Sequence, residues 1–263
     1  MSHLWACQLQ INTDLGSDAQ FFNPFGPYIL HSEIDEESRK ISLDFILQLD
    51  KDIKDGTIKS EGNIIAGVDG LDYEKNSISN GTMRRIPSDF NSSIIGNIIN
   101  YFTIDYFKQL EILNPFCDDS GTLFKQKEYT DCKTNESCII DAWYVMMEEG
   151  DFHIIHNHTY SSLIINDKKI DLSATAIVSG AIYLDIPEDI KTPQGDLNFI
   201  LNSHDVPLHN SHWFITPKSG DVYVWPGWLK HFVYPFKSKE KRIMVSFNSI
   251  WKKIDPKDGT VEY

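Results

Sequence analysis

The fold of this chain is decided by the stretch SGDVYVWPGWLKHFVYPFKSKEKRIMVSFNSIW, residues 219–251. It contains three runs rich in β-branched and aromatic residues, which are typical of strands. Pro226 and Gly227 separate the first two runs, and a segment rich in Pro, Lys and Ser separates the last two. We therefore predict strands at 221–225, 231–234 and 241–251, with the last two joined as a hairpin.

The same pattern extends back through the C-terminal half of the chain. Short runs of strand-forming residues alternate there with turn signals. Eight short strands in succession favour a sandwich or jelly roll over a parallel α/β sheet. The five further predicted strands are Trp143–Met147, His153–His158, Ala174–Leu184, Asp196–Leu201 and Trp213–Thr216.

The N-terminal half, residues 1–140, has helical rather than strand periodicity. One helix is predicted from about 34 to 53, with Ser32 as its cap, and a second from about 89 to 113. The second carries apolar residues at every fourth position, a stripe that is typical of core packing. Residues 56–87 are rich in Gly, Asn and Ser and predict loops with short strands. We expect one structural unit, α+β and mainly β, in which this helical region packs on the outside of a β core at 141–263.

Composition excludes some classes of function. The 263 residues carry a formal net charge of −14, and a negative field disfavours nucleic-acid partners. No run reaches the roughly 18 apolar residues of a membrane helix, and the N-terminus does not resemble a signal peptide. The four cysteines are scattered, and Cys132 and Cys138 are expected in a polar loop as reduced thiols, with a zinc or disulfide pair as the alternative. These features predict a cytoplasmic protein without a membrane partner.

His156 and His158 are the first candidate metal ligands. Side chains two residues apart on a strand point to one face, so the two imidazoles can reach the same ion. By the same alternation, His153 is expected on the opposite face. The alternative is that these histidines are hydrogen-bonded polar residues of an ordinary strand.

His231 and Arg242 follow on the next two strands. His231 is a third candidate ligand, and the permanently charged fork of Arg242 suits a carboxylate. If Arg242 faces inward, Met244, Ser246 and Asn248 do so as well, while Ile243, Val245 and Phe247 face outward. The alternative for Arg242 is a solvated charge at the end of a strand.

Other polar residues have less definite roles. The hydroxyl of Tyr183 is a candidate partner for a bound oxo acid, or else has a backbone partner. The segment 203–212 holds three more histidines and is expected to be a polar loop at the pocket mouth. The usual triad for non-haem iron includes a carboxylate. Asp185 and Asp221 are the candidates for it, but no spacing brings them to His156.

Five segments together resemble a known family: AWYVMMEEGDFHIIHNH, SGAIYLDIP, GDLNF, SGDVYVWPGWLKHFVYPF and RIMVSFNSIW. They are similar, in this order over about residues 142–251, to the 2-oxoglutarate- and Fe(II)-dependent oxygenases of marine bacteria and their phages. The resemblance implies a double-stranded β-helix distantly related to prolyl hydroxylases. It implies that Fe(II) binds His156, His158 and His231, and that Arg242 binds the distal carboxylate of 2-oxoglutarate. Tyr183 and Ser246, from their strand faces, are the other candidates for binding the cosubstrate.

The implied reaction consumes O₂ and 2-oxoglutarate, releases succinate and CO₂, and hydroxylates a small molecule or a protein side chain. The loop between His158 and Ser179 is long, which suggests a lid or recognition insert at about 159–178. Two alternatives stay open. One is a cupin-like enzyme with three His ligands that does not use 2-oxoglutarate. The other is a non-catalytic β-sandwich that binds a carbohydrate or a protein.

Overall fold

The computed structural model describes residues 3–5, 27–58, 82–87, 93–113, 135–158, 162–165, 168–171, 177–201, 212–254 and 261–262. Within them two helices accompany a larger number of strands, and every strand pair is antiparallel. The helices are α1 (Glu36–Lys54) and α2 (Ile94–Leu113). The strands are β1 (His3–Trp5), β2 (Ile29–Glu33), β3 (Thr82–Arg85), β4 (Asn135–Met147), β5 (His153–His156), β6 (Ser162–Ile165), β7 (Lys168–Asp171), β8 (Ile177–Asp185), β9 (Leu197–Ile200), β10 (His212–Ile215), β11 (Asp221–Pro226), β12 (Lys230–Val233), β13 (Arg242–Ile254) and β14 (Val261–Glu262).

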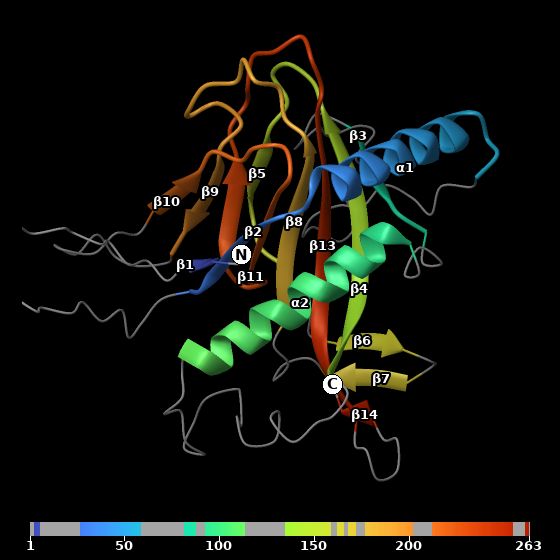
Figure 1. Ribbon diagram of the computed structural model, residues 1–263, viewed down its shortest axis with the longest axis vertical. Coiled ribbons are helices and arrows are strands. Elements are labelled where there is room, and N and C mark those ends of the chain that lie inside the picture. The colour runs from blue at the N-terminus through green and yellow to red at the C-terminus, as the bar shows by residue number, and fades with distance from the viewer. Residues whose placement is uncertain are drawn as a thin grey trace, which may run out of the picture.

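The strands form two sheets that face each other (Figure 1). The large sheet has the order β1-β2-β11-β8-β13-β4-β3, and β14 pairs with β13 at one end. The small sheet has the order β10-β9-β12-β5. Neighbours in space come from distant parts of the chain, as in a jelly roll. The mainly β, double-stranded β-helix fold expected from the sequence is confirmed, and each of the eight predicted strands has a counterpart.

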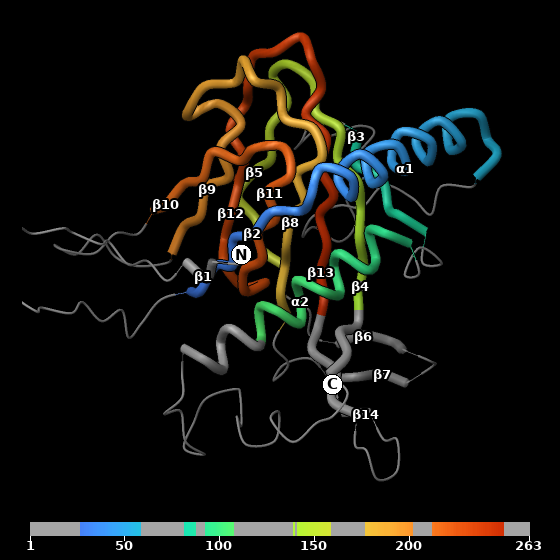
Figure 2. Tube along the Cα trace, viewed as in Figure 1, coloured from blue at the N-terminus to red at the C-terminus, as the bar shows by residue number. Residues whose placement is uncertain are grey.

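Two apolar cores lie on opposite faces of the large sheet. The inner core lies between the sheets and includes Leu197 and Phe199 of β9 with Val145 of β4. The outer core lies under α1 and α2, which cross the far face of the large sheet (Figure 2). Since side chains alternate along a strand, β4, β8 and β13 contribute to both cores.

Helix α1 begins later than expected, and its cap is a different residue. Asp35, not Ser32, caps it, and its carboxylate accepts a hydrogen bond from the Ser38 amide at 2.8 Å. Acidic residues occupy the first turn and lysines the last, which suits the helix dipole. Ser32 belongs to β2 instead, opposite Val222 of β11. Pairing of β2 with the distant strand β11 keeps Ser32 out of the helix.

Helix α2 packs against the sheet through a wider stripe than the sequence predicted. Phe102 and Tyr106 are buried as expected, but Ile95 and Ile99 are more deeply buried than Ile94 and Ile98 beside them. The Tyr106 hydroxyl donates to the carbonyl of Tyr28 at 3.1 Å. Residue 90 lies outside the described ranges, and at 110 only the backbone is described.

The N-terminal half contributes strands as well as helices. β2 and β3 both belong to the large sheet, where β3 pairs with β4 and β2 with β11. Cys138 lies in β4 opposite Ile250, so the polar loop expected around it is wrong at that residue. The other three cysteines lie outside the described ranges. Treating residues 1–140 and 141–263 as parts of a single unit stays a prediction.

The long segment after His158 contains a hairpin of β6 and β7. Its role as a lid or recognition insert stays a prediction. Neither helix of the described ranges has both the length and the apolarity that crossing a membrane requires.

Candidate metal and cosubstrate site

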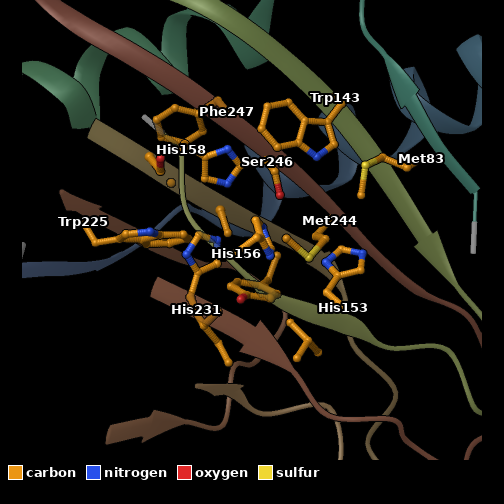
Figure 3. A pocket seen from close by; sticks show the side chains of 16 residues that line it. Met83, Trp143, His153, His156, His158, Trp225, His231, Met244, Ser246 and Phe247 are labelled. Atoms are coloured by element: carbon orange, nitrogen blue, oxygen red, sulfur yellow. The ribbon is translucent and has the colours of Figure 1, made fainter. Parts of the chain in front are cut away.

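The three predicted metal ligands converge between the two sheets (Figure 3). One potential ligand atom from each of His156, His158 and His231 lies within 4.8 Å of the others. The ring centroids of His156 and His231 are 4.3 Å apart, and that of His158 is 5.0 Å from His156 and 5.2 Å from His231. Three imidazoles gathered in this way are a donor set that suits iron, zinc or nickel.

Strand register brings His156 and His231 together. They are direct partners in the pairing of β5 with β12, and the next pair is Val233 with His153. Two steps along β12 therefore match three along β5, which is a β-bulge. The bulge leaves Ile154 and Ile155 both exposed and turns His153 into the pocket. The prediction that His153 faces away is wrong for this reason, although it is not part of the metal-binding group.

His158 lies beyond the end of β5 and is held by backbone contacts. Its amide donates to the carbonyl of Gly227 at 2.8 Å, and the Gly227 amide donates to the carbonyl of Ile177, also at 2.8 Å. A Cβ atom at position 227 would lie 2.6 Å from the His158 carbonyl oxygen. The glycine of the WPGW turn is therefore required for the close approach that places His158.

Burial keeps these imidazoles neutral. It lowers the pKa of His156, lowers that of His158 to about 3, and lowers that of His231 well below the ordinary value. Nδ1 of His156 lies 2.7 Å from the Ile154 carbonyl, and Nδ1 of His231 lies 2.9 Å from the Leu229 carbonyl. Because a carbonyl only accepts, both Nδ1 atoms carry the proton, and both Nε2 lone pairs are available to a metal.

Arg242 faces the interior and is fully buried. Met244 shares its face and belongs to the inner core, whereas Ile243, Val245 and Phe247 belong to the outer core, as the predicted alternation along β13 requires. Phe247 also lines the pocket. The guanidinium Nη1 contacts the sulfur atoms of Met147 at 3.2 Å and Met244 at 3.0 Å, and the Cζ atom lies 5.1 Å from the Tyr183 ring centroid. A solvated strand-end charge is excluded.

The polar atoms beside Arg242 fit an anionic ligand. Among the described residues, the Nε and Nη2 atoms of Arg242 and the Tyr183 hydroxyl are buried without a hydrogen-bond partner. Burial raises the pKa of Tyr183 to about 12, so its hydroxyl stays a donor. Unpaired buried donors are costly, and a carboxylate that accepts from a guanidinium fork satisfies several at once. The residues present therefore fit the distal carboxylate of an oxo acid.

The pocket beside the three imidazoles is mostly apolar. Tyr183, Ser246 and the three candidate ligands line it, together with Trp143, Trp225 and Met83 of β3. Ser246 thus lies on the predicted face. Trp225 and Met83 were not predicted as site residues, and only the aromatic content of the WPGW segment could have indicated Trp225.

No carboxylate joins the three imidazoles within the described residues. Asp221 contacts His31 instead, with Oδ1 2.9 Å from the His31 Nε2, and its Oδ2 accepts from the Lys218 amide. Asp185 pairs with Ile243 at the end of β8. Of the histidines expected in the 203–212 loop, His212 instead begins β10 and contacts Asn198, and the other two lie outside the described ranges.

Part of the chain matches a known protein family. Residues 171–248 match the family model described as "Putative 2OG-Fe(II) oxygenase". Among curated proteins no match to the chain is found. The match confirms, over these residues, the resemblance seen in the sequence: the segment is similar to 2-oxoglutarate- and Fe(II)-dependent oxygenases.

Solved structures with a similar arrangement of elements include three oxygenases. The prolyl-4-hydroxylase of Pseudomonas putida is 12% identical, with a TM-score of 0.44, over 86% of this chain and 93% of that one. HygX of Streptomyces hygroscopicus, with nickel and 2-oxoglutarate bound, is 13% identical, with a TM-score of 0.44, over 84% and 82%. The viral collagen prolyl hydroxylase of Paramecium Bursaria Chlorella virus-1 is 14% identical, with a TM-score of 0.41, over 84% and 95%.

Proposed function

We propose that this 2-oxoglutarate- and Fe(II)-dependent oxygenase is a hydroxylase that binds Fe(II) through His156, His158 and His231. Arg242, Tyr183 and Ser246 bind 2-oxoglutarate beside the metal. One observation carries the proposal: the metal-binding imidazoles and the guanidinium of Arg242 both lie in the interior between the two sheets. Three neutral imidazoles converge at one part of it, and a buried guanidinium with unpaired donors lies on the same face of β13 as Ser246.

The protein's contribution is binding, orientation and exclusion of water. When bound, Fe(II) and 2-oxoglutarate supply the oxidation: O₂ converts the oxo acid to succinate and CO₂ and hydroxylates a C–H bond. Burial holds the imidazoles neutral, so the Nε2 lone pairs of His156 and His231 are free for the metal at neutral pH. The aromatic and thioether walls of the pocket keep bulk water from these groups.

Arg242 and Tyr183 select the cosubstrate. The guanidinium is charged at all relevant pH values, and its fork matches a carboxylate better than an ammonium does. Tyr183 adds a neutral donor, since burial raises its pKa to about 12. A ligand that joins Arg242 to the imidazoles needs a carboxylate at one end and chelating oxygens at the other, and 2-oxoglutarate has both.

The substrate is an unidentified small molecule or a protein side chain, and the second substrate is O₂. The described residues that line the pocket include no Asp, Glu, Lys or Arg, which favours a neutral reacting group. The formal net charge of −14 disfavours nucleic acid. The scattered cysteines favour the cytoplasm, which is the location we propose.

Anaerobic titration with Fe(II) followed by 2-oxoglutarate tests the proposal. We expect a visible charge-transfer band that appears only when both are present and saturates with 2-oxoglutarate. This readout does not require the substrate to be known. Metal binding without the band would favour the cupin-like enzyme, and a protein that retains no Fe, Mn, Co or Ni would favour the non-catalytic sandwich.

A further inference from the structure

A row of polar side chains crosses three neighbouring strands of the large sheet and contacts the metal-binding group at His158. Asn248 of β13 is the direct register partner of Ser179 on β8 and of Asp141 on β4. Residues paired in this way point to the same face of a sheet, so the three side chains meet. Ser179 and Asn248 are fully buried, and the Asp141 side chain is 9% exposed.

Hydrogen bonds fix the orientation of the Asn248 amide. Its Nδ2 lies 2.9 Å from Oδ1 of Asp141, and its Oδ1 accepts from the Ser179 hydroxyl at 2.7 Å. A carboxylate only accepts, so the amide atom that faces Asp141 must be the nitrogen. Turning the amide over would place two oxygens against each other, and the charge of Asp141 opposes this.

The same amide nitrogen faces His158. Nδ2 of Asn248 lies 3.4 Å from Nδ1 of His158, and an amide nitrogen only donates. Nδ1 of His158 is therefore the acceptor, and the proton of this neutral imidazole resides on Nε2. His156 and His231 show the opposite arrangement, since their Nδ1 atoms donate to backbone carbonyls. A metal-bound imidazole normally donates from its other nitrogen, which His158 does not do here.

We propose that Asn248, oriented by Asp141, is a positioning residue that makes His158 a conditional metal ligand. This inference rests on the proposed function. His156 and His231 offer lone pairs and are the primary ligands. His158 presents an N–H group to the same site and binds metal through Nε2 only after its proton moves to Nδ1. Asp141 opposes this proton shift because it holds the Asn248 amide with its N–H group towards His158. A protonated Nδ1 of His158 would need an acceptor at that position.

Asp141 also forms an ion pair with Arg85, whose Nη2 lies 3.8 Å from Oδ2, and the Arg85 side chain is 42% exposed. A long, solvated ion pair of this kind contributes little. It therefore leaves the hydrogen bond between Asp141 and the Asn248 amide in place.

Imidazole tautomers measured by long-range ¹H–¹⁵N correlation spectra of the metal-free protein at neutral pH test the first step. We expect the Nδ1–H form for His156 and His231 and the Nε2–H form for His158, with assignments made from single His→Gln variants. An Nδ1–H form for His158 in the unaltered protein overturns the inference.

Exchanging the two groups tests the second step without changing charge or size. In the double variant Asp141→Asn with Asn248→Asp, a carboxylate accepts directly from Nδ1 of His158, and the amide at 141 donates to it. We expect His158 to adopt the Nδ1–H form and Co(II) to bind about 10–100-fold more tightly, the range for outer partners of metal ligands. Thermal unfolding of the metal-free variant shows whether the exchange preserves the fold.

A His158→Gln change in both backgrounds completes the cycle. It should weaken Co(II) binding much more in the exchanged protein than in the unaltered one. His231→Gln is the matched control and should cost the same in both. Equal losses for His158→Gln in the two backgrounds contradict the role of Asn248. If the unaltered protein binds no Co(II), the proposed function itself is contradicted. That result differs from equal losses in the two backgrounds, which contradict only the role of Asn248.

Discussion

The two faces of the large sheet are built from the same strands and have opposite chemistry. The outer face of β13 carries Ile243, Val245 and Phe247 under the helices, while its inner face carries Arg242 and Ser246. On the outer face the buried side chains are mostly apolar, and the Tyr144 hydroxyl among them donates to Asp50 at 2.9 Å. On the inner face a guanidinium, a phenol and imidazoles are buried at a cost in desolvation. The outer face therefore stabilises the fold, whereas the polar groups of the candidate metal and cosubstrate site on the inner face lower its stability.

His231 on the opposing sheet provides the strongest test of this division. His231→Ala removes one of the two lone pairs that the structure presents to a metal. We expect Co(II) affinity to fall about a thousandfold or more, a loss of about 4 kcal/mol. Anaerobic Co(II) titration followed by absorption measures it. An affinity that stays within tenfold would separate the imidazole group from metal binding altogether.

Arg242→Met should affect function and stability in opposite directions. The side chain is buried between the thioethers of Met147 and Met244, so a methionine fits this environment. We expect 2-oxoglutarate affinity to fall about 100-fold, the scale for truncating one partner of a buried charge pair. Without the cosubstrate, the free energy of unfolding should stay equal or rise, because a buried charge without a full set of partners is removed.

The measurements are the charge-transfer titration for affinity and guanidinium chloride unfolding for stability. If the variant unfolds more easily but keeps its 2-oxoglutarate affinity, Arg242 stabilises the fold and the cosubstrate site lies elsewhere.

The inner face should also make the stability of the metal-free protein depend on pH. Burial lowers the pKa of His153 and of His158 to about 3, against 6.5 for the ordinary group. As the pH falls below 6.5 the unfolded chain takes up protons and the folded chain does not, so stability is lost towards pH 3. Above 6.5 this contribution is constant.

Between pH 7 and pH 5 we expect a loss of at most about 2 kcal/mol for each imidazole that stays neutral. Denaturant unfolding at the two pH values measures it, and His158→Gln should flatten the dependence. A curve with the same slope in this variant would show that other groups cause it.

Ile182→Val on the outer face should have the smallest effect. The side chain is 1% exposed in the core under the helices. Loss of one methylene costs about 1 kcal/mol in unfolding experiments. Co(II) and 2-oxoglutarate affinities of the folded protein should not change, since the inner face is untouched. A change in either affinity would show that the two faces are coupled through the strand.

Sequence patterns predicted the elements that depend on local alternation. The inward set beginning at Arg242 followed from parity alone, because the pairing of β13 with β4 is regular from Arg242 to Asn248. The register shift at Ile243 and Met244 adds its extra residue to β8, not to β13. The same argument failed for His153, since a bulge in β5 adds one residue and reverses the parity before His156. Nothing in the short run from His153 to His158 indicates where such a residue is inserted.

Local sequence patterns could not predict contacts between segments that are distant in the chain. β2 lies next to β11, which follows it by about three-quarters of the chain, and the sequence of β2 does not indicate that partner. The row formed by Asp141, Asn248 and Ser179 likewise depends on the register of three strands. Asn248 was predicted to face inward, but its neighbours could not be named without that register.

Gly227 sets a limit on how this protein can evolve. Any side chain at this position would collide with the backbone of His158, and no rotamer relieves a contact made by Cβ itself. The Pro-Gly-Trp turn can therefore accept substitutions at Trp228, which is 52% exposed, but not at the glycine. Among natural variants of this chain that retain the metal-binding group, position 227 should be invariant even though its residue takes part in no chemistry.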